Sequence, residues 1–200
     1  MNLPSSNLSP SVIDKVQPNA STKAQSRYVA MMFDTVSRSL VLASRIDTVI
    51  LDEISALPDG LVIAMSIYGT NLGFALKITP ASDGGGKSLA RVTDFDESYL
   101  KAVPKHQLLH IRFKHLAYAY QVLSFQKSTA AAFAANHMVV NGDLGCAVTL
   151  VRCLNRLESV ILPKALARRA IKVYPKQLSL AQKLNLALRI YGKLIVSLTK

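Results

Sequence analysis

Histidines are the first side chains of this sequence whose spacing could support chemistry. His106 and His110 lie an even number of residues apart, on one face of a predicted strand, and His115 follows that strand. Imidazoles on one face could bind a metal ion, but no cysteine or carboxylate stands beside them in the sequence to complete the ligand set. We therefore interpret these histidines as part of a solvated, basic strand face.

A cluster of acidic side chains, Asp94, Asp96 and Glu97, precedes this strand. Carboxylates at this spacing could bind a cation, but the sequence lacks the glycine and the distal glutamate of a calcium loop. We prefer to interpret them as turn and cap residues, because short acidic side chains accept hydrogen bonds from free backbone amides. An alternative hypothesis is an enzyme that acts on a lipid. These carboxylates and His106 are the residues that come nearest to a catalytic site for it.

The glycine-rich run at 84–88 resembles the end of a phosphate-binding loop. Ala81 stands where that motif requires glycine, and the run is predicted to connect two strands instead of a strand and a helix. Cys146 and Cys153 lack the spacing of a redox or metal pair, and we predict that both are reduced thiols in the core. The sequence thus predicts no catalytic residue, no metal site and no cofactor.

The overall composition excludes several classes of protein. Of 200 residues, 50% are hydrophobic and 18% are charged, with a mean hydropathy of +0.25, which excludes a disordered chain and indicates one domain. An uncharged stretch at 60–76 is interrupted by Gly69-Thr70-Asn71, which is typical of a hairpin and not of a membrane-spanning helix. The N-terminus lacks the pattern of a secretory signal, so we expect an intracellular, cytoplasmic protein.

The hydrophobic pattern predicts an α+β domain after a disordered N-terminal tail at 1–26. Apolar residues recur at helical spacing over 28–51, which predicts one long helix or two shorter ones before Pro58. Alternating residues then predict strands, of which the first three should form an antiparallel meander. The predicted strands are 61–68, 72–79, 88–93, 108–113 and 138–140, and the later helices are 115–125, 128–136 and 143–162. Together they predict a five-stranded, mostly antiparallel sheet with helices covering one face.

Positive charge is concentrated at the C-terminus. The formal net charge is +12, and residues 160–200 carry nine lysines and arginines with no aspartate or glutamate. We interpret 163–200 as a basic amphipathic helical extension of the domain at 27–162. Such an extension favours docking on an anionic membrane surface, with packing on the core as the alternative. The candidate membrane-contacting residues are Lys176, Lys183, Arg189, Lys193 and Lys200.

Residues 109–162 carry a pattern of elements that is typical of one family. A strand is followed by a helix that ends in a polar break, a helix that contains Ala132-Phe133, a short strand, and Gly142-Asp143 at the start of an apolar helix. In this order the sequence resembles the sterol carrier protein 2 (SCP2)-like lipid-transfer domains, over about residues 28–162. It departs from the family pattern at Gln126-Lys127-Ser128, where a glycine is usual, and around Asn136-His137.

The resemblance implies a noncatalytic protein that binds and transfers a lipid in an apolar tunnel between sheet and helices. The lipid would be a fatty acid, an acyl-CoA, a phospholipid, a sterol or an isoprenoid. A protein that encloses such a ligand should be rich in aliphatic side chains and poor in buried charges, as this sequence is. A related alternative is an accessory factor that presents isoprenoid or quinone intermediates to lipid-metabolising enzymes as its partners. The candidate tunnel-lining residues are Met65, Ile67, Phe74, Leu76, Ile111, Phe113, Phe133, Met138, Leu150, Leu154 and Leu157.

A hypothesis from another class is nucleic-acid binding, because lysines and arginines displace counterions from phosphates. The chain has no tryptophan and only 6% aromatic residues, and it lacks the aromatic motifs on which single-stranded bases stack. We therefore expect lipid binding, with nucleic acid as a less favoured partner.

Overall fold

A computed structural model of the chain describes residues 20–81, 86–93, 95–161, 185–190 and 192. Its centre is a five-stranded sheet in the order β3-β2-β1-β4-β5. β1 pairs in parallel with β4, whereas the other pairings are antiparallel, so the sheet is mixed and mostly antiparallel as predicted. The strands are β1 (Val62–Ile67), β2 (Gly73–Pro80), β3 (Lys87–Arg91), β4 (Leu108–Phe113) and β5 (Met138–Asn141).

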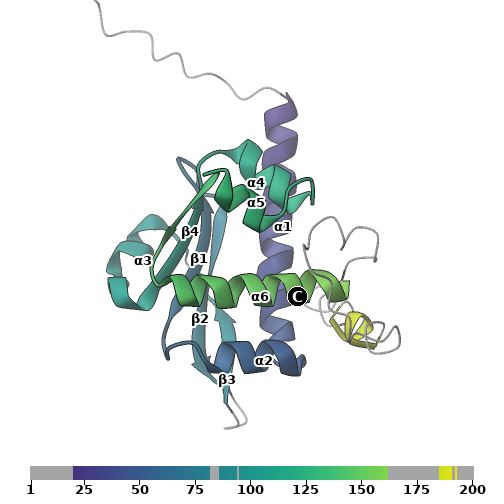
Figure 1. Cartoon of the computed structure of the whole chain (residues 1–200). Helices are drawn as coiled ribbons and strands as arrows, with labels where there is room; N and C mark the ends of the chain where they lie inside the picture. Colours follow the sequence, from purple (N-terminus) through teal and green to yellow (C-terminus); the bar gives the residue numbers. More distant parts are fainter. Residues whose placement is uncertain (1–19, 82–85, 94, 162–184, 191, 193–200) are drawn as a thin grey trace, which may run out of the picture.

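The helices are divided unequally between the two faces of the sheet (Figure 1). In the described ranges, α1, α2, α4, α5 and α6 lie on one side, and the short α3 lies on the other. The predicted α+β class is therefore confirmed, with the addition of a helix on the second face. The helices are α1 (Ala20–Ala43), α2 (Thr48–Ser55), α3 (Glu97–Ala102), α4 (Leu116–Leu123), α5 (Thr129–Ala134) and α6 (Leu144–Ile161), and a 3-10 turn, η1, covers Lys105–Gln107.

The main core fills the space between the sheet and the larger group of helices. Alternation along β4 sends Leu109, Ile111 and Phe113 into this core, as their period of two predicts. Phe33 of α1 lies across the sheet, with its ring centroid 5.7 Å from that of Phe74 and 6.5 Å from that of Phe113. The aromatic side chains thus join α1 to strands on both sides of β1.

A smaller apolar cluster holds α3 on the other face. Leu100 of α3 packs with Val62, Ala64 and Ala75 from β1 and β2. Asp96 caps the helix, because its carboxylate accepts a hydrogen bond from the amide of Tyr99 at 2.6 Å. The cap role predicted for this carboxylate is confirmed, whereas the sequence pattern did not predict the helix that follows it.

Two sequence predictions change in detail, and one open alternative is decided. α1 already begins at Ala20, so residues 20–26 are helical and not part of a disordered tail, while 1–19 lie outside the described residues. Of the two alternatives for 28–51, the structure has two helices, because the side chain of Asp47 accepts from the amide of Val49 at 3.0 Å and starts α2. His110, predicted on a solvated face, is 4% exposed because α3 and its flanking loops cover that part of the sheet.

Other predictions are confirmed. Cys146 and Cys153 are buried, free thiols. The part of the 84–88 run that the structure describes lies in the β2–β3 hairpin and its strand: Lys87 of β3 donates to the carbonyl of Leu57 at 2.6 Å and pairs with Asp59 at 3.1 Å. Within the described residues, no helix is long and apolar enough to cross a membrane.

Candidate functional site

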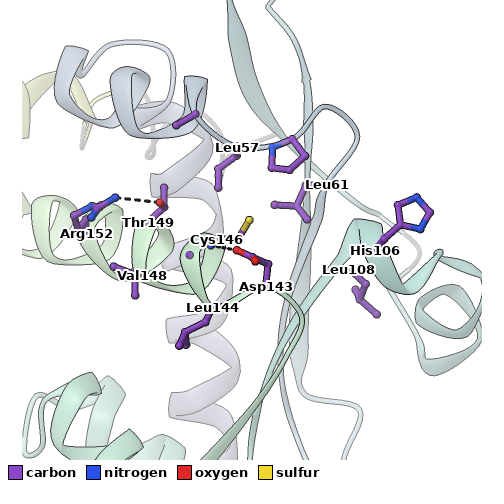
Figure 2. A pocket seen from close by; sticks show the side chains of 13 residues that line it. Leu57, Leu61, His106, Leu108, Asp143, Leu144, Cys146, Val148, Thr149 and Arg152 are labelled. Carbon is purple, nitrogen blue, oxygen red and sulfur yellow. Dashed lines mark hydrogen bonds between the residues drawn. The ribbon is translucent and has the colours of Figure 1, made fainter.

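A groove opens beside the first two turns of α6, where that helix faces the end of α2 and the start of β1 (Figure 2). Its volume is about 850 Å³, within the range of pockets that hold small organic ligands. We call it the α6 groove. It is lined by Ala56, Leu57, Pro58, Leu61, His106, Leu108, Asp143, Leu144, Gly145, Cys146, Val148, Thr149 and Arg152.

The α6 groove connects exposed apolar side chains with the main core. Leu144 and Val148, one helical turn apart on α6, are 62% and 47% exposed. Leu57 and Leu61 on the opposite wall are buried members of the main core cluster. The groove thus places two exposed apolar side chains next to the edge of the main core, and a cluster of exposed apolar side chains can mark a binding site.

The polar groups of the α6 groove have structural partners. Asp143 caps the start of α6, because its carboxylate accepts a hydrogen bond from the amide of Cys146 at 2.8 Å, and this bond lowers the pKa of the carboxyl group. Burial, with the nearby Asp143 charge, raises the pKa of the Cys146 thiol. A raised pKa favours the protonated thiol, which is a weaker nucleophile than the thiolate.

Two ion pairs hold α2 against α6 next to the α6 groove. Arg156 of α6 contacts the carboxylate of Asp47 at 2.9 Å, and the Asp47 side chain is 2% exposed. Arg152 contacts Glu53 of α2 at 2.9 Å in a more exposed position, and it also donates to Thr149 at 3.2 Å. These contacts set the spacing between the two walls.

The predicted tunnel-lining residues separate into two groups. Ten of them belong to one buried cluster between the sheet and the helices. Phe133 of α5 is 49% exposed and does not join them. The α6 groove itself is lined by other residues, whose role the sequence pattern did not indicate. The ten buried residues are Met65, Ile67, Phe74, Leu76, Ile111, Phe113, Met138, Leu150, Leu154 and Leu157.

The C-terminal cations fall mostly outside the described residues. Lys176, Lys183, Lys193 and Lys200 lie there, and Arg189 is exposed on a helical segment at 185–190. In this segment Ile190 is buried in the main core, while Leu188 is 64% exposed. The segment thus packs on the main core through Ile190, with Leu186 and Ala187 partly buried beside it, and presents Leu188 and Arg189 to solvent.

A second cavity lies on the other face of the sheet, beside α3. We call it the polar cleft; it comprises two adjoining spaces of about 630 and 1020 Å³ that share Gly69, Glu97, Leu100 and His110. Ser66 lines the first space and Arg112 lines the second. Ser66 Oγ lies 2.8 Å from His110 Nε2. Sequence reasoning missed this pair because its two members are far apart in the chain and meet only through the β1–β4 pairing.

The hydrogen bond between Ser66 and His110 runs in the opposite direction to that of a catalytic serine–histidine pair. A guanidinium can only donate, so Arg112, 3.3 Å from His110 Nδ1, requires that nitrogen to accept. Burial, followed by the Arg112 charge, lowers the pKa of His110 to about 4, so the ring is neutral near pH 7. Its single proton is then on Nε2 and is donated to Ser66, whereas a serine nucleophile needs a histidine nitrogen that accepts its proton.

Metal binding has no support from the side chains that the structure describes, since no three His, Cys, Asp or Glu residues among them lie close enough together to hold an ion.

Comparisons with known proteins found no matching family model, no matching curated protein and no matching solved structure. The observed fold agrees with the five-stranded α+β arrangement that the hydrophobic pattern predicts. The resemblance itself remains a prediction from the residues of the sequence.

Proposed function

We propose that this protein binds a lipid without chemical conversion and transfers or presents it, and that the acyl or isoprenoid chain lies in the α6 groove. One observation carries the proposal. The exposed side chains of Leu144 and Val148 line a groove that is also lined by residues of the main core. An apolar chain in this groove would remove both side chains from water, at about 0.8 kcal/mol for each buried CH₂ group.

The packing beneath the groove suggests how a long chain would be accommodated. Leu57 and Leu61 belong to the same cluster as the ten buried candidate residues, so the end of a chain could extend between α6 and the sheet after small side-chain shifts. The walls are joined by side-chain ion pairs and not by backbone hydrogen bonds of a sheet. Separation of α2 from α6 is therefore the expected route of entry.

The first test is native mass spectrometry of the gently purified protein, followed by extraction and identification of the bound lipid. We expect a stoichiometric lipid in the wild type. In the double variant Leu144→Glu/Val148→Glu we expect roughly a tenfold or larger loss of lipid, because carboxylates would be desolvated against an apolar chain. Both positions are exposed, so the free energy of unfolding should change by less than about 0.5 kcal/mol.

A matched control is the double variant Met31→Glu/Val49→Glu. These side chains are 55% and 44% exposed, on α1 and α2, and they do not line the α6 groove. The control should retain its lipid. If both double variants retain the lipid equally, the lipid does not lie in the α6 groove. A wild-type protein that carries no lipid and also rejects added fatty acid, phospholipid and quinone would contradict the proposed function.

Delivery of the lipid would use the C-terminal cations, which we propose contact an anionic membrane. Support comes from exposed Leu188 and Arg189 on the segment at 185–190. Each lysine or arginine near such a surface contributes about 1 kcal/mol. Changing the five candidate cations to glutamine should therefore weaken binding to phosphatidylglycerol vesicles by at least roughly 100-fold at low salt.

The vesicle measurement needs a control with the same net charge. The control variant has glutamine in place of five other lysines and arginines. It should bind vesicles much more strongly than the C-terminal variant. Equal weakening by both variants would show a general charge effect and contradict C-terminal docking. The control positions are Lys23, Arg27, Arg45, Lys77 and Lys114.

A further inference from the structure

The polar cleft contains three side chains whose positions are fixed by the central strand pairing. Ser66 of β1 and Arg112 of β4 are partners in the parallel register, and His110 is two residues earlier on β4. Side chains two residues apart on a strand share one face, so all three lie on the face that α3 partly covers. His110 and Ser66 are 4% and 8% exposed, which makes this a built part of the sheet and not a flexible surface cluster.

The hydrogen bonds of this row leave the hydroxyl proton of Ser66 without an acceptor among the described residues. Arg112 donates to His110 Nδ1 and His110 Nε2 donates to Ser66 Oγ, as the guanidinium requires. The hydroxyl proton of Ser66 then has no acceptor among the residues that the structure describes. A nearly buried hydroxyl group that lines a cavity gains from an acceptor on a bound molecule.

Arg112 adds a positioned cation in the adjoining space of the polar cleft, on the other side of His110. Its guanidinium carbon lies 4.9 Å from the ring centroid of Tyr68, so the ring holds one face of the group. In the described ranges no carboxylate forms an ion pair with Arg112, although six other cationic side chains have such partners. Lys101 and Lys105 line the same cleft; Lys101 lies 3.9 Å from the carboxylate of Glu97, whereas Lys105 has no such partner among the described residues.

We propose that the polar cleft binds an oxyanion, the phosphate or carboxylate group of a small ligand, between the guanidinium of Arg112 and the hydroxyl of Ser66. The planar fork of arginine matches two oxygens of such a group, and the serine supplies a third donor. Asp96 and Glu97 also line the cleft, so a ligand with a hydroxyl or amino group near its oxyanion gains acceptors there. This site lies on the opposite face of the sheet from the main core and does not depend on lipid binding in the α6 groove.

The test follows the ring protons of the four histidines by NMR during titration with inorganic phosphate and with glycerol 3-phosphate. We expect His110 to shift most and its pKa to rise, because a bound anion offsets the Arg112 charge. His115 and His137, which both contact Tyr118 elsewhere, should shift little. Arg112→Gln should weaken binding by roughly 10- to 100-fold, since it removes hydrogen bonds to a charged ligand.

Arg45→Gln provides the control, because Arg45 is an exposed arginine that does not line the cleft and the net charge changes equally. A second arm uses phosphatidylcholine vesicles with and without phosphatidic acid. Binding in the vesicle arm alone would identify a lipid headgroup as the source of the oxyanion, and binding of the soluble phosphates would identify a free metabolite. Equal shifts of all histidines, equal affinity in Arg112→Gln and Arg45→Gln, or no shift of His110 in either arm would overturn the proposal.

Discussion

Replacement of Asp47 by alanine is expected to lower the free energy of unfolding by about 3–5 kcal/mol, because it leaves a partly buried arginine without its partner. The Asp47 side chain is 2% exposed and that of Arg156 is 18% exposed. The same carboxylate also accepts from the amide of Val49 and caps α2. One substitution thus removes the N-cap of a helix and the contact that joins this helix to α6. Chemical denaturation with urea measures the effect.

The neighbouring ion pair provides the comparison for Asp47. Glu53→Ala breaks the contact with Arg152, whose side chain is 55% exposed, so the cost should be at most about 1 kcal/mol. Asp47→Asn should be intermediate, since the amide oxygen can still cap α2 but carries no charge. The combination of Asp47→Ala with Arg156→Ala should be less destabilising than the sum of the single changes. Additive single effects would contradict a direct coupling between the two side chains.

Gly142→Ala is expected to destabilise the protein by about 3–4 kcal/mol, through backbone strain and a steric clash together. Gly142 has a φ of +126°, which side chains other than glycine rarely adopt. A Cβ atom there would lie 2.5 Å from the carbonyl oxygen of Leu108 and 3.0 Å from the Cα atom of Leu109. These are backbone atoms of β4, so they cannot rotate away, and the start of α6 would have to move.

Gly86→Ala separates the two causes. Gly86 has a similar φ of +136°, but a Cβ atom there would meet nothing within 4 Å. Its cost should therefore be strain alone, about 1–2 kcal/mol. Thermal or urea unfolding of both variants gives the difference. If Gly142→Ala costs no more than Gly86→Ala, the backbone at Gly142 is not in the tight contact with β4 described above. Because Leu108 lines the α6 groove, Gly142→Ala should also reduce lipid retention.

The sequence predicted the strands and the main core well because one-sided burial produces a period of two. Leu109, Ile111 and Phe113 are buried together for this reason. The cap roles of Asp96 and Asp143 were also predictable, since a short carboxylate before a helix has a local partner.

What could not be predicted depends on short or distant elements. α3 has six residues, too few for a helical period to appear in the sequence. If α3 is not predicted, the second face of the sheet is expected to be exposed to solvent. For this reason the sequence pattern predicts a solvent-exposed His110. The partner of His110 is Ser66, 44 residues away, and no local pattern specifies that two strands so far apart will pair in parallel. Both cavities use such contacts, so neither was predictable from spacing alone.

The parallel β1–β4 pairing has a consequence for the order in which the chain folds. β1, β2 and β3 are joined by short connections and can form early, whereas β4 must return across the completed meander to reach the free edge of β1. β4 supplies Leu108 to one cavity and His110 and Arg112 to the other. The two cavities therefore share one late folding step, and a local opening that releases β4 would abolish both of them at once.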